Sequence, residues 1–306
     1  MRTTSGHLIL QDFTMPNEKK QHQPPLSVEQ QILNLKELGL VIEDEDSARK
    51  LLNDVSYFRL IKAYSLTLKP KNGNYANGTT FNQIRELYLF NANFRQQLFP
   101  LIEKIEINLR CRIANYFCEK YGVFGHREER NFKNAEYHNE FMHDLANEED
   151  RNAQSPFVKN FRQNYEPDDL PLYAVVELLS FGTLSKFFKN MKNEDKKAIA
   201  KTFGVGYTYF ESWIESIANV RNLCAHYGRL YNAKLTKTPK LYDQYSSLGI
   251  KNNRIFAILL CMHHVLESDT LWVCFVDILE ALFEKYPHVR KNCMGFPNDW
   301  KILLQA

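Results

Sequence analysis

The chain contains the sequence FNQIRELYLFNANFRQQLFPLIEKIEINLRCRIANYF at residues 81–117. Its apolar side chains recur every three or four residues, which is the spacing of one buried face on an α-helix. This stripe comprises Phe81, Ile84, Leu87, Tyr88, Phe94, Leu98, Leu101, Ile102, Ile105, Leu109, Ile113, Tyr116 and Phe117. Pro100 interrupts the pattern, so a kink or a fresh first turn is expected there. The stretch predicts one long element of an antiparallel helical bundle.

The sequence on both sides of this stretch is also helical. Thr80 and Gln83 form a capping-box pattern, which Ser27 and Gln30 repeat near the start of the chain. No run alternates convincingly with the period of two that a half-buried strand requires. Helical apolar spacing returns at residues 171–181, 194–202, 207–226 and 254–283. The predicted fold class is therefore all-α, a helical bundle with an N-terminal helical extension.

Changes of composition predict the organisation of the chain. Residues 1–25 are polar and lack periodicity, so we expect a flexible N-terminal arm. Residues 26–75 would form the N-terminal helical extension, and residues 76–306 the main helical domain. Residues 125–168 are rich in acidic side chains and weakly periodic. There we expect a surface insertion with broken helices.

The overall composition bounds the class of protein. The 306 residues are 44% hydrophobic and 25% charged, as in a folded soluble protein. Six cysteines without a C-x-x-C pair indicate a reducing compartment and no metal site. The longest apolar run, 255–266, is short of the roughly 20 residues that span a bilayer, and the N-terminus lacks a signal peptide. We expect a cytoplasmic protein that needs no cofactor and no membrane.

Charge is uneven along the chain, although the net charge is only +3. Between Lys186 and Lys240 there are 11 Lys and Arg against 4 Asp and Glu, an excess of +7 that leaves −4 for the remainder. A basic segment of this kind can bind phosphate. It can equally be a solvated helix face, and the sequence leaves both interpretations open.

A cluster of polar side chains interrupts the apolar stripe in ESWIESIANVRNLCAHYGRLYN, residues 211–232. On an ideal helix Asn222 and His226 share a face, and His226 and Arg229 are also neighbours, whereas Arg221 and His226 are about 140° apart. One helix alone cannot easily direct both Arg221 and His226 at one phosphate. A two-fold dimer could, because it would bring two copies of the helix face to face.

Arginine and histidine together suit the cleavage of RNA. Histidine can take the proton from a ribose 2′-hydroxyl or give one to the 5′-oxygen, and arginine presents a fork that matches phosphate. Internal attack by the 2′-hydroxyl needs no metal. The alternative is an arginine in a surface ion pair and a histidine packed within the bundle, because Arg-x-x-x-x-His is common by chance.

The segment RNLCAHYGRLYN resembles the signature of the Abi family, the AbiD and AbiF type of abortive-infection proteins within the HEPN superfamily, whose motif is Arg-polar-x-x-x-His. Residues 36–64, 81–117, 171–191 and 296–300 resemble successive blocks of that family in the same order. The resemblance implies a helical HEPN fold, a homodimer and metal-independent cleavage of an RNA substrate. It also implies a role in phage defence, or as a toxin restrained by an RNA or protein antitoxin.

Positions carried over from the family give the candidate catalytic residues Arg221, Asn222 and His226. Arg229 and Asn232 belong to the adjacent block, where they would hold substrate phosphate or brace the helix. The family often has a second histidine where this chain has Tyr227. A tyrosine can still form a hydrogen bond to phosphate, so we expect function to be retained.

Glu106 and Arg110 are separated by four residues on the long predicted helix. They can form an intrahelical ion pair, which contributes roughly 0.3–0.5 kcal/mol. Glu106 could instead lie behind the active helix and orient Arg221 or His226. Both interpretations remain open at this point.

Three hypotheses for function follow, in order of preference. The first is an endoribonuclease whose Arg221 and His226 face a shared basic cleft across a dimer. The second is a non-catalytic module that holds an RNA or a phage component. The third is a protein–protein scaffold, which predicts a buried, ion-paired Arg221 and an inaccessible His226.

Overall fold

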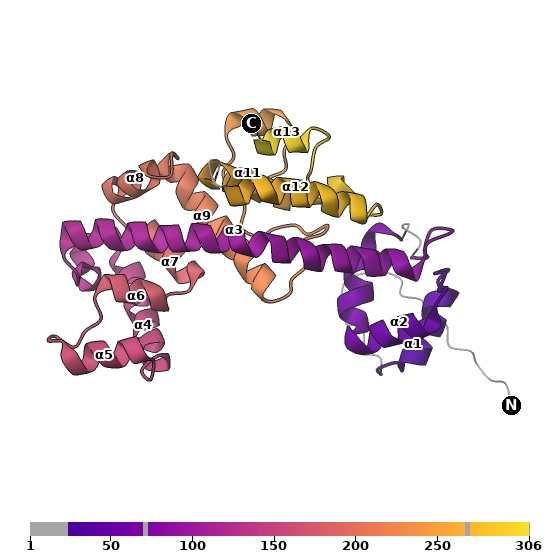
Figure 1. Ribbon diagram of the computed structural model, residues 1–306, viewed down its shortest axis with the longest axis horizontal. Helices are drawn as coiled ribbons and strands as arrows, with labels where there is room; N and C mark the ends of the chain where they lie inside the picture. The colour runs from indigo at the N-terminus through magenta and orange to yellow at the C-terminus, as the bar shows by residue number, and fades with distance from the viewer. Residues whose placement is uncertain (1–23, 70–72, 267–269, 306) are drawn as a thin grey trace, which may run out of the picture. The chain divides into compact units, whose positions relative to one another are not determined.

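The computed structural model describes residues 24–69, 73–266 and 270–305 (Figure 1). In these ranges the chain is helical and contains no strand, only two isolated β-bridges. The all-α prediction is confirmed. The chain forms two compact units, one up to Phe90 and one from Asn91 onward.

The first unit is a small group of helices. Its helices α1 and α2 pack against each other. Both predicted capping boxes are present, Ser27 with Gln30 and Thr80 with Gln83. The predicted arm lies outside the described residues except for residues 24 and 25. The unit contains α1 (Val28–Glu37), α2 (Glu45–Asp54), a π-helical turn (Phe58–Lys62), a 3-10 turn (Ser65–Thr67) and the first turns of α3 (Phe81–Tyr121).

Helix α3 is a single helix of 41 residues that passes through Pro100 without ending. Pro100 and Gln96 are both exposed, so the carbonyl that lacks an N–H partner faces the solvent side of the helix. The predicted apolar stripe is buried, with Ile105, Leu109 and Phe117 all inaccessible. The expected fresh first turn at Pro100 is therefore wrong.

The second unit is built around α9. Helix α9 packs against α7, α8 and α11, while α13 packs against α11 and α12. Figure 1 shows α11, α12 and α13 gathered together and α4 and α6 gathered elsewhere in the same unit. Its other helices are α4 (Ala135–Arg151), α5 (Pro156–Asn164), α6 (Leu172–Leu178), α7 (Phe181–Asn190), α8 (Asn193–Lys201), α9 (Tyr207–Ala225), α10 (Asp243–Ser247), α11 (Ile255–Leu266), α12 (Thr270–Lys285) and α13 (Trp300–Gln305), with 3-10 turns at Gly125–Arg127, Glu129–Asn131 and Lys291–Met294.

The acidic segment at 125–168 is better ordered than its composition suggests. Helix α4 runs unbroken for 17 residues and buries His138, Phe141 and Leu145. Phe141 contacts Phe187 of α7 with ring centroids 5.0 Å apart. The prediction of broken helices is therefore wrong for α4, because its buried side chains follow helical spacing while the acidic ones occupy the other faces.

A buried carboxylate ties α8 to the end of α3. Asp195 is inaccessible and accepts hydrogen bonds from Tyr116 (3.0 Å), Lys120 (2.5 Å) and Tyr121 (2.9 Å). Burial alone would lower the pKa of Lys120, but its hydrogen bonds to acidic partners raise it above its usual value. A buried charge is stable only when it is paired in this way. The contact therefore fixes α8, which packs on α9.

A buried histidine should make the stability of the second unit depend on pH. Burial, and then the charge of Arg127, lower the pKa of His126 to about 3. The unfolded chain binds this proton near pH 6.5, so stability falls as pH drops below that value. We expect the wild type to lose about 2 kcal/mol more than His126→Phe between pH 7 and pH 5 in urea unfolding. Equal losses in both proteins would contradict this account.

Candidate functional site

The candidate motif lies where α9 ends. The helix stops at Ala225, and His226 is its C-cap. The N–H of Tyr227 donates to the carbonyl of Cys224 (3.2 Å), and that of Gly228 to the carbonyl of Leu223 (2.6 Å). These two bonds form a Schellman motif, which reverses the chain directly after His226. His226 and Arg229 are consequently not neighbours on one helix face, as an ideal helix would make them.

Two residues give the reversal its shape. Tyr227 has a φ of 57°, which is a left-handed conformation. For a residue with a side chain this conformation costs about 1–2 kcal/mol. A Cβ at Gly228 would lie only 2.8 Å from the backbone oxygen of Leu223. Only glycine fits that close approach. The Tyr227 side chain is 68% exposed, so the strained residue presents its ring to solvent beside the motif.

Helix α3 holds the loop that follows. The Asn91 side-chain oxygen accepts hydrogen bonds from the N–H groups of Leu230 (2.7 Å) and Tyr231 (2.9 Å). Its amide nitrogen donates to the carbonyl of Gly228 at 3.4 Å, and Arg95 donates to the same carbonyl at 3.1 Å. Asn91 is fully buried and Arg95 is 8% exposed. The motif loop is thus fastened to α3 through its backbone.

Asn91 and Arg95 were not among the residues predicted from the sequence. Both lie within the apolar stripe of α3, between Leu87 and Leu98, and both are buried with it. A polar side chain at a core position needs hydrogen-bond partners, so its place in the stripe was the available signal. Its partners could not be named, because they lie more than 130 residues away in sequence.

An ion-pair cluster stands behind the motif. The Glu106 carboxylate pairs with Arg110 on its own helix and lies 3.7 Å from the Nε of Arg221 on α9. Arg110 also donates to the backbone carbonyls of Val176 and Leu179, the latter at 2.7 Å. Both geometries considered for Glu106 therefore occur together: it forms the intrahelical pair, and it contacts Arg221.

The cluster carries surplus positive charge. One carboxylate faces two guanidinium groups, which leaves a formal charge of +1. The Arg221 side chain is 36% exposed and donates no hydrogen bond within the described ranges. Its guanidinium fork can therefore accept a phosphate while Glu106 holds it from one side.

His226 and Asn222 are both exposed near the end of α9. The backbone N–H of His226 donates to the carbonyl of Asn222 at 3.0 Å. Neither side chain makes a hydrogen bond to another residue that the structure describes, so both can meet a ligand. The scaffold hypothesis predicted an inaccessible His226 and a buried, ion-paired Arg221. His226 is exposed, which counts against it, whereas Arg221 is half-buried and does pair with Glu106.

The remaining candidates lie farther along the loop. Asn232 has a φ of 52°, and its side-chain oxygen accepts from Arg254 at 3.4 Å. Arg254 also donates to the carbonyl of Ala233 at 3.0 Å. This geometry matches a bracing role for Asn232. Arg229 is half-buried and lies between the two anchored parts of the loop.

Thiol chemistry does not suit this site. Burial raises the pKa of Cys224 to about 12, although the nearby charge of Arg95 acts in the opposite direction. The thiol stays protonated at neutral pH and is a poor nucleophile. Over the described ranges, no group of three or more His, Cys, Asp or Glu side chains is placed to hold a metal ion. Within the same ranges, no helix combines the length and apolar character needed to cross a membrane.

Comparison with known families shows which family this all-α chain belongs to. A family described as Abi-like protein matches residues 50–232, which is more than half of the chain. The chain therefore belongs to the Abi-like protein family. The match includes α3 and the whole motif, but not the block at 296–300. No curated protein and no solved structure matches the chain.

Removing the Asn91 side chain should destabilise the second unit. In Asn91→Ala the N–H groups of Leu230 and Tyr231 lose their acceptor in a buried setting, so we expect a loss of about 2–4 kcal/mol. Urea unfolding followed by circular dichroism measures it. The control is Asn115→Ala on the exposed face of the same helix, which should change stability by less than about 0.5 kcal/mol. Equal effects of the two changes would contradict the role assigned to Asn91.

Proposed function

We propose that this Abi-like protein is a metal-independent endoribonuclease of the HEPN type, with Arg221 and His226 as its catalytic residues. The observation that carries the proposal is that one helix presents both groups. Arg221 pairs with Glu106 and keeps its guanidinium fork open, and His226 is exposed at the end of the same helix. Family membership supports a role in abortive infection, and so in phage defence or as a toxin. The activity belongs in the cytoplasm, where phage and host RNA meet.

The reaction uses groups that the motif presents. The ribose 2′-oxygen attacks the adjacent phosphorus, and the bond from phosphorus to the 5′-oxygen breaks. His226 takes the 2′-hydroxyl proton or supplies the proton that the 5′-oxygen gains, and solvent water exchanges the other proton, so the protons balance. Arg221 stabilises the charge that develops on the phosphate oxygens. The products are a 2′,3′-cyclic phosphate and a 5′-hydroxyl. The step requires no metal ion, and no water molecule acts as the nucleophile.

The surroundings of the motif add to this site. Asn222 and Tyr227 are exposed beside His226 and can form hydrogen bonds to RNA. Arg95 forms no ion pair with any residue that the structure describes, so its buried charge attracts an anion to the loop. These features favour phosphate over a neutral ligand.

A homodimer would complete the arrangement. Arg221 and His226 are five residues apart on or at the end of α9, so one chain directs them about 140° apart. A two-fold axis beside this helix end would let Arg221 of one copy and His226 of the other face one phosphate. Because such a nuclease would damage its host, an RNA or protein antitoxin is the partner that we expect to restrain it.

Loss of either catalytic side chain should abolish RNA cleavage. With excess EDTA and a mixed RNA pool, the wild type should leave 2′,3′-cyclic phosphate ends. Arg221→Ala and His226→Ala should each reduce the rate by at least about 100-fold, because the reaction loses charge stabilisation or proton transfer. Gel electrophoresis and mapping of the product ends measure both effects.

Matched substitutions distinguish chemistry from a general loss of structure. Arg130→Ala and His143→Ala remove one exposed arginine and one exposed histidine away from α9, so each should retain wild-type cleavage. RNA that stays intact with the wild type while still binding it would favour the alternative, a non-catalytic module that holds an RNA or a phage component. Cleavage that survives in both motif variants would overturn the assignment of the site.

A further inference from the structure

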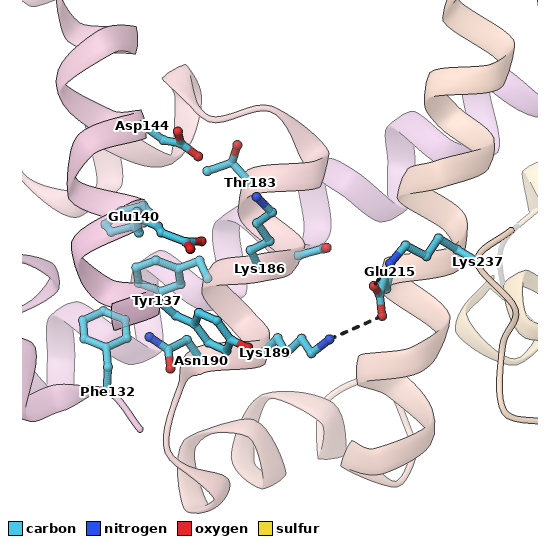
Figure 2. A pocket seen from close by; sticks show the side chains of 13 residues that line it. Phe132, Tyr137, Glu140, Asp144, Thr183, Lys186, Lys189, Asn190, Glu215 and Lys237 are labelled. Atoms are coloured by element: carbon cyan, nitrogen blue, oxygen red, sulfur yellow. Dashed lines mark hydrogen bonds and ion pairs between the residues drawn. The ribbon is translucent and has the colours of Figure 1, made fainter. Parts of the chain in front are cut away.

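A cavity lies between α4, α7 and α9, and none of the motif residues lines it. Its volume is about 240 Å³, and Lys237 lines it beside Glu215 (Figure 2). For comparison, an apolar cavity of roughly 150 Å³ holds a benzene molecule. The pocket can therefore accept a flat ring system larger than one six-membered ring.

The wall of the pocket is aromatic. Phe132 and Phe141 each contact Phe187, with ring centroids 5.2 Å and 5.0 Å apart. Tyr137 also lines the pocket and is 53% exposed. The three phenylalanines are at most 7% exposed and pack on one another, so they form the floor of the pocket, and Tyr137 is the ring on which a base can stack. Stacking on an aromatic side chain contributes about 1–3 kcal/mol for each base.

Two lysines at one side of the pocket share a single acid. The Glu215 carboxylate lies 2.8 Å from the Lys237 ammonium and 3.7 Å from that of Lys189. The hydrogen bond from Lys237 lowers the pKa of Glu215, so the acid stays ionised at neutral pH. Two cations against one anion leave a formal charge of +1. That charge can hold the phosphate attached to a bound base.

The opposite side of the pocket carries carboxylates that can accept hydrogen bonds from a ligand. Figure 2 shows the carboxylates of Glu140 and Asp144, one turn apart on α4, on the side facing Thr183 and Lys186 of α7. None of Glu140, Asp144 and Lys186 forms an ion pair with a residue that the structure describes. Ser185 is only 8% exposed, and its hydroxyl makes no hydrogen bond within the described ranges. The two carboxylates can accept hydrogen bonds from a ligand, and Lys186 can donate one to it, so a ligand with several donors and an acceptor would match them.

We propose that this pocket binds a guanine base, which, if the proposed function holds, belongs to the RNA substrate. Guanine carries adjacent N1–H and N2–H donors that one carboxylate accepts together, and an O6 acceptor that a lysine can meet. Adenine and cytosine each offer one amino group there, and uracil offers one N–H. Glu140 and Asp144 thus select guanine, while Lys186 contacts its oxygen.

The position of the pocket fits a role in substrate choice. Glu215 precedes Arg221 by six residues on α9, which is about 9 Å along the helix axis and about 120° around it. A strand whose guanine enters the pocket would have to curve around α9 to bring a nearby phosphate to Arg221. The basic segment between Lys186 and Lys240 contributes Lys186, Lys189 and Lys237 to this surface, which gives its excess charge a specific use.

Direct binding of nucleotides tests the pocket without any cleavage. Calorimetry with the four ribonucleoside 5′-monophosphates should show that GMP binds about tenfold more tightly than AMP, CMP or UMP. Glu140→Gln combined with Asp144→Asn should reduce GMP affinity about tenfold and remove the preference. Glu136→Gln, on the same helix but outside the pocket, should bind GMP as the wild type does. Equal affinity for all four nucleotides, or unchanged GMP binding in the double variant, would overturn the proposal.

Two further arms separate the pocket from the proposed nuclease and identify the source of the base. Arg221 does not line the pocket, so Arg221→Ala should bind GMP as the wild type does. The guanine site can therefore be tested even if the protein cleaves no RNA. His226→Ala blocks the proposed cleavage but keeps Arg221. If the base comes from RNA, short oligoribonucleotides with one guanine should bind this variant more tightly than GMP does, and more tightly than the same sequence with adenine in its place. GMP binding with no such gain would assign the pocket to a free guanine nucleotide and contradict its role in RNA selection.

Discussion

The amide of Asn91 is the contact on which the candidate site depends most. It is fully buried, and it satisfies two backbone N–H groups and one carbonyl in the loop after His226. Without it, those backbone groups would be buried without partners, so the loop has no equally stable alternative path. The close approach of Gly228 to Leu223 and the left-handed Tyr227 then fix how the chain enters this loop. An exposed histidine is thereby held at a defined point.

Shared carboxylates set the charge of both sites. Glu106 faces Arg110 and Arg221 in the motif cluster, and Glu215 faces Lys189 and Lys237 in the pocket. In each case one acid positions two cations, and in the pocket Glu140 and Asp144 add two carboxylates on the other side. Glu215 and Arg221 both lie on α9, whose neighbour α8 is anchored through Asp195. One helix thus contributes a charged residue to each site.

Local patterns predicted the helices, the capping boxes and the position of the motif, because these depend on residues close together in sequence. The chain reversal after α9, which separates His226 from Arg229, could not be predicted in the same way, since a tyrosine rarely occupies the left-handed position of a Schellman motif. Asn91 and its partners are 137 residues apart or more, and the pocket requires α4 to pack on α7. The acidic composition of α4 concealed the helical spacing of its buried side chains. Contacts between distant segments therefore decided what the sequence left open.

Amide hydrogen exchange tests most directly whether Asn91 holds the motif loop. The account predicts that the amides of Leu230 and Tyr231 exchange as slowly as those of α9 in the wild type, and roughly tenfold or more faster in Asn91→Ala. Amide exchange in α12 should be the same in both proteins, because Asn91 forms its hydrogen bonds with the loop and not with α12. Exchange at the rate of an open loop in the wild type, or the same rate in both proteins, would contradict it.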